Sequence, residues 1–274
     1  MCPHCRAFIT TDDKVCPYCD AQVGPRAVDM RSPVAVMGGL VPSGRFVTSL
    51  ILLLNAGLYL TTVVYSSNSG NPSPIQGIDW RTLYVFGGKL REAIFGGDYW
   101  RLVTAGFLHG GILHFLMNTW AMFDLGATVE EYFGGARMVI IYFAGTVMGF
   151  AASTMWSPAL SIGASAGLFG LIGAMIGYGS MHGSAFGGMV KAHYTRWAIY
   201  GLILGLIGNI DNAAHLGGLA GGFAVARIAG TPLLDAKREQ IWHWLCYLCL
   251  ALTAYSFAQM AATFARHSAP RQFL

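Results

Sequence analysis

A serine stands near the start of a long apolar stretch of this chain, within a run of small residues. Ser165 lies in the run SIGASAGLFG, which covers residues 161–170. A serine hydroxyl can act as a nucleophile when a neighbouring base takes its proton. Ionisable groups inside apolar, membrane-type segments are energetically costly, so such groups near Ser165 would indicate a functional site.

Three residues in other apolar segments could complete this site. His215 lies in the run AAHLGG at residues 213–218 and is the candidate base. His114 and Asn118 are four residues apart, which places them on one face of a helix and lets both donate hydrogen bonds into the same space. Hydrolysis of a peptide bond by serine requires a base of this kind and donors that stabilise the tetrahedral intermediate.

The composition indicates that lipid surrounds most of the chain. Of the 274 residues, 54% are hydrophobic and 11% are charged, whereas a soluble domain carries roughly a quarter charged residues. The deficit of charge lies between about Phe46 and Phe264, and the mean hydropathy is +0.51. The net charge of +4 is spread over the loops, with no basic run among aromatic residues. The pattern therefore favours the lipid bilayer as a partner and excludes nucleic acid.

Seven apolar spans predict an all-α polytopic membrane protein. Glycines 217, 218, 221 and 222 in the sixth span permit close helix packing, which implies a compact bundle around a central helix. The segment between the first two spans is polar and then aromatic, and we expect it at the membrane interface. The predicted spans cover residues 46–65, 103–123, 137–156, 163–180, 196–209, 212–229 and 241–264.

The distribution of Lys and Arg predicts the orientation of these spans. With a cytoplasmic N-terminus, 11 of the 17 basic residues lie on the cytoplasmic side, a bias expected of a multi-pass protein of the bacterial inner membrane. Ser165 and His215 then both begin spans at the non-cytoplasmic face. We therefore expect them at similar depth, close enough to form a hydrogen bond.

Four of the six cysteines form two CxxC pairs near the N-terminus. Cys2 and Cys5 belong to the run CPHC, and Cys16 and Cys19 to the run CPYC. This spacing is typical of a zinc ribbon, in which four thiolates bind one structural zinc ion in a tetrahedron. Two disulfides are the alternative, which the lack of a signal peptide ahead of the cysteines disfavours.

The cysteine pairs also predict how the chain is divided. Residues 1–31 are too few for a hydrophobic core, so we expect a small module that needs its metal to fold. A linker at 32–45, a membrane domain at 46–264 and a tail at 265–274 follow it. Cys246 and Cys249, one helical turn apart in the last span, are expected to pack as small apolar side chains rather than to act as a redox pair.

The residues around the serine and the candidate base resemble two signatures of rhomboid intramembrane serine proteases. The run GASA at 163–166 resembles the GxSx motif of that family. The run AHLGG at 214–218, followed by Gly222, resembles its AHxxGxxxG helix.

Further positions extend the resemblance to about residues 80–230. His109, His114 and Asn118 match the family pattern HxxxxHxxxN in sequence order. The pair Trp100-Arg101 resembles part of the first loop of the family. Residues 126–134, which include Glu130, resemble its connection between the second and third helices.

The resemblance implies a six-helix membrane bundle, here followed by a seventh helix, that cleaves transmembrane or juxtamembrane segments of other membrane proteins. It implies Ser165 as the nucleophile and His215 as the general base, a dyad with no acid and no catalytic cofactor. It also implies an oxyanion hole formed by backbone groups of Gly163 and Ser165 and by the side chains of His114 and Asn118.

Two positions depart from the family pattern. Ala166 follows the nucleophile where many members have glycine, and Phe169 stands where several have a tyrosine that stacks on the histidine. A phenylalanine ring can still stack there. The N-terminal cysteines and the seventh helix lie outside the resemblance, so a cytosolic partner of the zinc module is left open.

Three other interpretations remain open. A catalytically silent relative would bind membrane helices as a chaperone or adaptor, although the presence of both Ser165 and His215 disfavours it. A metal ion could bind His109, His114 and His215, but a spacing of five residues is poor for two ligands on one helix face. Asp211 could orient His215 as in a triad, but at a helix start it is expected to be an N-cap.

Overall fold

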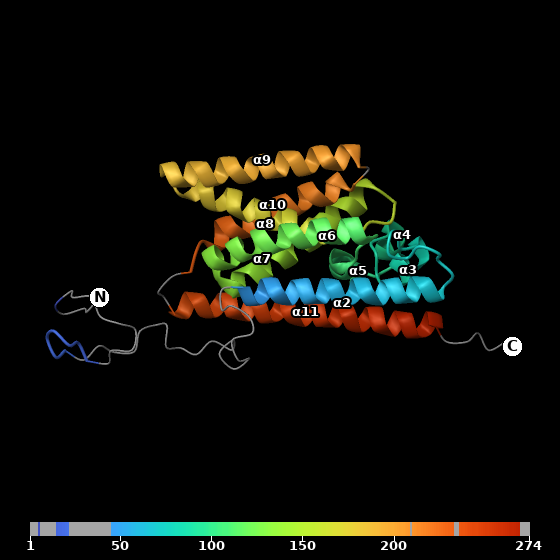
Figure 1. The fold of residues 1–274 in the computed structure, drawn as a ribbon, viewed down its shortest axis with the longest axis horizontal. Coiled ribbons are helices and arrows are strands. Elements are labelled where there is room, and N and C mark those ends of the chain that lie inside the picture. Colours follow the sequence, from blue (N-terminus) through green and yellow to red (C-terminus); the bar gives the residue numbers. More distant parts are fainter. Residues whose placement is uncertain (1–4, 6–14, 22–44, 209, 233–235, 269–274) are drawn as a thin grey trace. The chain divides into compact units, whose positions relative to one another are not determined.

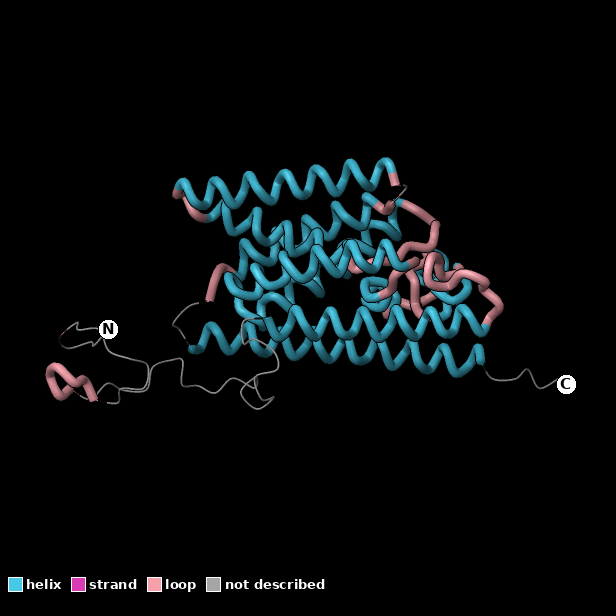
Figure 2. The backbone as a smooth tube through the Cα atoms, in the orientation of Figure 1, coloured by secondary structure: helices cyan, strands magenta, loops and turns pink. Residues whose placement is uncertain are grey.

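The computed structural model describes residues 5, 15–21, 45–208, 210–232 and 236–268 (Figures 1 and 2). The chain forms two compact units, Met1–Phe46 and Val47–Leu274. Of the predicted zinc module, Cys5 and residues 15–21 are described, whereas Cys2 lies outside the described residues. Most of the predicted linker and the last six residues of the predicted tail also lie outside them.

Among its described residues, the regular secondary structure of the larger unit is helical, apart from one isolated β-bridge between Lys89 and Ser161, and loops join the helices. Two short turns of other helix types also occur, a 3₁₀ turn at Ala105–Phe107 and a π-helical turn at Met122–Gly126. The α-helices are α2 (Phe46–Asn68), α3 (Trp80–Val85), α4 (Arg91–Phe95), α5 (Arg101–Thr104), α6 (Ile112–Ala121), α7 (Ala127–Trp156), α8 (Ser165–Met181), α9 (Ala185–Ile207), α10 (Asn212–Ala229) and α11 (Ala236–Ser268).

Several of these helices have the composition of membrane spans. Within the described residues, Phe46–Asn68, Ile112–Trp156 and Glu239–Ala265 are long and apolar enough to cross a bilayer. Ser165–Met181 is apolar but shorter. The chain is an integral membrane protein, and seven crossings stay a prediction.

The predicted second span, residues 103–123, is not one continuous helix. The helix α5 and the 3₁₀ turn after it end before α6 begins, so His109 lies in the connection between them. Backbone groups of this connection pair with the segment 75–78: the N–H of Ile78 donates to the oxygen of Gly110 and the N–H of Ile112 to that of Ile75, both at 2.9 Å. Gly111 permits this approach, because a Cβ atom there would meet the backbone oxygen of Gln76. The close approach of two loop segments thus overrides the helix that the apolar pattern predicts.

The connection after that span, expected around residues 126–134, is helical almost throughout. Within α7 one residue is not helical: Gly134, with φ of 75° and ψ of 159°. Before this glycine, Glu130 contacts the start of α2, whereas the end of α7 at Thr154 contacts α4, near the C-terminal end of α2 (Figure 1). The chain therefore turns back at Gly134. A glycine can adopt this positive φ without steric cost.

The predicted fifth span, residues 196–209, is too short, because α9 already begins at Ala185. Ser184 caps this helix by accepting a hydrogen bond from the N–H of Gly187 at 3.2 Å. The first part of α9 contains glycine, lysine and histidine, so hydropathy alone misses a helix that its cap stabilises. The sixth span agrees better: α10 covers the predicted residues 212–229.

The long helices of the larger unit lie alongside one another, and α8 is the most enclosed (Figure 1). Of its 17 residues, 13 are buried, and it packs against α7, α9 and α10. The short helices α3, α4 and α5 gather at one end of the long ones. At the side of the unit opposite α9, α2 lies beside α11, where the rings of Tyr65 and Phe264 are 5.3 Å apart (Figure 1). Cys246 and Cys249 of α11 are both buried, in an apolar cluster.

Glycine residues bring α8 and α10 into backbone contact. A Cβ atom on Gly222 would lie 1.8 Å from the backbone oxygen of Gly170, and one on Gly218 would lie 2.2 Å from that of Ala166. No side chain fits into either gap. Small residues at a helix interface permit this approach, which brings the N-terminal turns of both helices together.

Two buried charged residues of α7, Glu130 and Arg137, join this helix to the outer helices α2 and α11. Glu130 accepts hydrogen bonds from the backbone N–H groups of Val47 and Thr48, each at 2.9 Å, and so lies at the N-terminus of α2, where negative charge is favourable. Arg137, only 3% exposed, donates two hydrogen bonds to Glu239 of α11 at 2.6 and 2.8 Å. This two-pronged contact joins α11 to α7.

We predict that Glu130→Gln destabilises the protein by roughly 1.5–3 kcal/mol, because it removes the charge that two backbone N–H groups and one hydroxyl face. The measurement is thermal unfolding of the purified protein in detergent. The matched control is Glu131→Gln, since Glu131 is the adjacent carboxylate but is exposed. Equal unfolding temperatures for the two variants would contradict this role of Glu130.

Candidate active site

Ser165 is the first residue of α8, directly after the loop that joins it to α7. His215 lies in the first turn of α10 and is 4% exposed. The distance from Nε2 of His215 to Oγ of Ser165 is 3.0 Å, a hydrogen-bond distance. The two helices that meet through glycine therefore bring together the two residues that the sequence pairs.

The ring of His215 is held by stacking. It lies parallel to the ring of Phe169, with 4.1 Å between the ring centres and 9° between the planes. Phe169 is one turn after Ser165 in the same helix, so α8 supplies both the hydroxyl and the surface on which the imidazole rests. The substitution of phenylalanine for tyrosine at this position keeps the stack.

The carboxylate of Asp211 makes its hydrogen bonds to groups other than the ring of His215. Its carboxylate accepts a hydrogen bond from the backbone N–H of Ala214 at 3.0 Å, as an N-cap does, and another from the hydroxyl of Ser153. Burial alone would raise the pKa of Asp211, but hydrogen bonds from Ser153, Ser161 and Ala214 hold it below its usual value. Within the described residues, Nδ1 of His215 has no hydrogen-bond partner. Among the described side chains, the hydrogen-bonded contact at this point joins Ser165 and His215 and does not include Asp211.

His114 and Asn118 are both in α6, and His114 lies close to Gly163 and Ser165. The backbone N–H of Gly110 donates to Nδ1 of His114 at 3.3 Å. In a neutral ring the proton must then be on Nε2, which becomes a donor. The amide of Asn118, only 5% exposed, donates one of its two N–H groups to the backbone oxygen of His114 at 2.9 Å.

Gly163 separates His114 from Ser165. A Cβ atom on Gly163 would lie 2.9 Å from Nε2 of His114 and 3.3 Å from Oγ of Ser165, and its φ of 137° suits glycine. The N–H of Gly163 donates to the backbone oxygen of Ala105 at 2.9 Å. The donor role expected for Gly163 in an oxyanion hole therefore needs revision, because this N–H is already engaged.

His109 is fully buried in the connection before α6, with its ring edge-on to that of His114 at 5.3 Å. Neither ring nitrogen of His109 has a hydrogen-bond partner among the described residues. Within the described part of the chain, the side chains that lie close enough together, in a group of at least three, to hold a metal ion are those of Cys5, Cys16 and Cys19. The structure thus gives no support to a metal site made of His109, His114 and His215.

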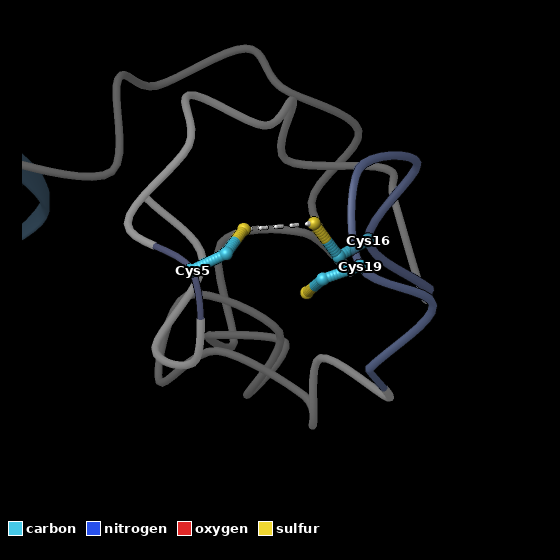
Figure 3. A group of neighbouring side chains, drawn as sticks. All are labelled: Cys5, Cys16 and Cys19. Atoms are coloured by element: carbon cyan, nitrogen blue, oxygen red, sulfur yellow. Dashed lines mark hydrogen bonds between the residues drawn. The ribbon is translucent and has the colours of Figure 1, made fainter.

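The three cysteines of the smaller unit lie close together (Figure 3). Their sulfur atoms are all within 4.8 Å of one another, and those of Cys5 and Cys16 are 3.7 Å apart. Thiolates bound to one tetrahedral zinc ion at about 2.3 Å are about 3.8 Å apart. Three of the four predicted ligands therefore fit a zinc ion, and the fourth, Cys2, lies outside the described residues.

The sequence agrees with a known protein family over this site. A family model described as the rhomboid domain matches residues 96–232, half of the chain. The chain belongs to the rhomboid family. This confirms, at the level of the family, the resemblance carried by the serine and histidine motifs.

Individual relatives of this rhomboid include active and inactive proteins by name. It is 36% identical over 172 residues to "Rhomboid protease GluP" of Bacillus subtilis, which is 62% of this chain and 34% of that protein. It is 32% identical over 166 residues to "RHOMBOID-like protein 4" of Arabidopsis thaliana, and 29% identical over 158 residues to "Inactive RHOMBOID-like protein 8" of the same plant. These matches cover 58% and 56% of this chain and 41% and 45% of the two plant proteins. The chain thus spans about a third to a half of their lengths.

Sequence reasoning missed one group of residues at this site. Ser153 and Ser161 donate hydrogen bonds to Asp211, and Lys89 donates to the loop before Ser165. None of the three was part of a motif. A lysine after two glycines in an aromatic segment was a weak signal for a buried charge. Their proximity arises from the fold and not from spacing in the chain.

We predict that Asp211→Asn leaves the reactivity of Ser165 nearly unchanged, because an asparagine oxygen can still accept from the N–H of Ala214. The measurement is the rate at which Ser165 reacts with a fluorophosphonate probe. The control Asp211→Ala should cost about 1 kcal/mol of stability through loss of the cap. A rate loss on the order of 10⁴-fold in Asp211→Asn would instead indicate a triad.

Proposed function

We propose that this protein is an intramembrane serine endopeptidase that cleaves transmembrane or juxtamembrane segments of other membrane proteins. The observation that carries the proposal is the 3.0 Å contact between Oγ of Ser165 and Nε2 of His215. This contact is available for proton transfer from the hydroxyl to the imidazole. Membership of the rhomboid family supports the substrate class, since rhomboid proteases act on membrane proteins.

In this mechanism Ser165 attacks the carbonyl carbon of the scissile peptide while Nε2 of His215 takes the hydroxyl proton. Collapse of the tetrahedral intermediate expels the amine, which receives that proton and leaves an acyl-enzyme on Ser165. Water then attacks the ester, with His215 again the base, and the serine is restored. No metal ion or organic cofactor is needed for these steps.

We propose three donors that would stabilise the negative oxygen of the intermediate. They are the Nε2–H of His114, the second amide N–H of Asn118 and the backbone N–H of Ser165, which at the first position of α8 has no acceptor within the helix. Gly163 contributes space rather than a donor. Without a side chain at this position, His114 can face the oxyanion.

The proposed topology follows the charge distribution. A cytoplasmic N-terminus places the dyad near the non-cytoplasmic face of a bacterial inner membrane, so water reaches the acyl-enzyme from that side. Six helices would form the catalytic bundle, and α11 would be a seventh. Its fixed contact with α7 through Arg137 and Glu239 supports α11 as a permanent part of the bundle.

We also propose that the smaller unit is a zinc ribbon, in which Cys2, Cys5, Cys16 and Cys19 bind one zinc ion. The spacing of three of the sulfur atoms supports it. A site with four thiolate ligands has no open position, so the ion would supply structure and no catalysis. A cytosolic partner or a regulatory role is then the expected use of the ribbon.

We predict that Ser165→Ala and His215→Ala each abolish cleavage of a transmembrane reporter by the purified protein, because each removes one side of the proton transfer. Cleavage is followed by gel or mass spectrometry after reconstitution into liposomes. Ser153→Ala serves as a control serine near the site that takes no part in the steps above. Persistent cleavage by Ser165→Ala, with wild-type folding, would contradict the serine mechanism and favour a chaperone-like or adaptor relative.

We predict one zinc ion per chain in the purified protein. Cys5→Ser and Cys16→Ser should each lose most of the bound zinc, because three thiolates hold the ion more weakly than four. The metal content is measured by atomic emission, with Cys246→Ser as the control because that cysteine packs in α11. A chain with intact cysteines and no zinc after purification without chelators would rule out the ribbon.

A further inference from the structure

The loop before Ser165 is held by a lysine that lies far from it in the sequence. Lys89 stands between α3 and α4, and its side chain is 0% exposed. Its amino group donates to the backbone oxygen of Ser157 at 2.9 Å and to that of Ala159 at 3.0 Å. Both acceptors belong to the loop that leads from α7 into the active site.

The backbone of the same lysine binds the next turn of this loop. The N–H of Lys89 donates to the oxygen of Ser161, and the N–H of Ser161 donates to the oxygen of Lys89, both at 2.9 Å. One residue therefore makes four hydrogen bonds to the loop. The side-chain bonds reach Ser157 and Ala159, and the backbone bonds reach Ser161.

These contacts follow a regular order that ends at the nucleophile. Every second residue of the loop is tethered, first at 157, 159 and 161 by Lys89 and then at Gly163 by the backbone oxygen of Ala105. Two residues later the chain reaches Ser165. The position of its hydroxyl thus depends on a loop whose own groups are fixed one after another.

Burial of the lysine calls for a functional explanation. Lysine is almost never fully buried without a partner, and an unbranched apolar side chain of similar length would fill the same space without desolvating a charge. Burial lowers the pKa of Lys89, although the negative charge of Asp211 counteracts that shift. The amino group is therefore present at a cost in desolvation, and what it adds is the pair of bonds to the loop.

We infer that Lys89 is a positioning residue for the catalytic serine, acting through the carbonyl groups of Ser157 and Ala159. Its bonds hold the loop in the register that keeps Oγ of Ser165 at 3.0 Å from His215 and Gly163 beside His114. This inference rests on the proposed role of Ser165 as the nucleophile. It adds a residue outside the segment that matches the rhomboid model, which begins at residue 96.

The test compares Lys89→Met with Lys89→Arg in the purified full chain. The rate at which a fluorophosphonate probe labels the protein reports the reactivity of Ser165. The final extent of labelling reports the fraction of molecules with a folded site. For Lys89→Met we expect the rate and the kcat for a transmembrane reporter to fall roughly 10-fold to 100-fold, since small displacements of reacting groups cost that much. The final extent of labelling and the KM should stay near wild-type values. Lys89→Arg, which keeps a donor for the carbonyl groups, should recover part of the rate.

Glu130→Gln is the matched control, because it destabilises the protein at the opposite end of the bundle. It should lower the unfolding temperature yet leave the labelling rate unchanged. If Lys89→Met folds poorly, Lys89→Gln, which retains one amide donor, replaces it. A wild-type labelling rate in Lys89→Met, or a loss confined to the final extent, would overturn the inference while leaving the serine mechanism intact. Labelling that persists in Ser165→Ala would instead overturn the proposed function itself.

Discussion

The backbone contact between α8 and α10 is the constraint on which the rest of this structure depends. Gly170, Gly218 and Gly222 leave no room for side chains between these helices, so their first turns lie within reach of each other. The hydrogen bond between Ser165 and His215 is a consequence of this approach. In lipid, where burial of apolar surface gives helices little reason to associate, such close packing is also a main source of stability.

The polar groups of the larger unit are arranged around this contact according to what each can accept or donate. The carboxylate of Asp211 caps the N-terminus of α10 and accepts a hydrogen bond from Ser153. His215 is therefore oriented by its stack on Phe169 rather than by a carboxylate. The amino group of Lys89 donates its hydrogen bonds to backbone oxygens. The site therefore relies on positioned backbone and aromatic surfaces more than on paired charges, which suits a medium where isolated charges are costly.

The sequence was sufficient for the features that depend on local pattern. The apolar spans predict an all-helical membrane protein, the sixth span has the bounds of α10, and its small residues predict the tight packing of that helix. The serine and histidine motifs identify two side chains that the fold brings into contact. These features are encoded by residues that are close together in the chain or that belong to one helix.

The features that could not be predicted depend on contacts between distant segments. At the break before α6 the backbone of Gly110 and Ile112 pairs with the segment 75–78, and the reversal at Gly134 needs one backbone angle that hydropathy does not report. The sequence gives at most a weak sign that Lys89 is buried, and none of its bonds to a loop some seventy residues later. The early start of α9 was missed for a different reason, since its cap and not its hydropathy defines it.

The placement of Ser165 at the first position of α8 has an electrostatic consequence for the proposed reaction. The peptide dipoles of a helix add up to roughly half a positive charge at its N-terminus. The field of the 17 residues of α8 therefore points at the spot where negative charge develops during attack on the carbonyl. Because most residues of α8 are buried inside the protein, its field is screened less than it would be in water. The helix that carries the nucleophile would thus also act as a fixed cation, with no ionisable side chain that has to be kept charged inside the membrane.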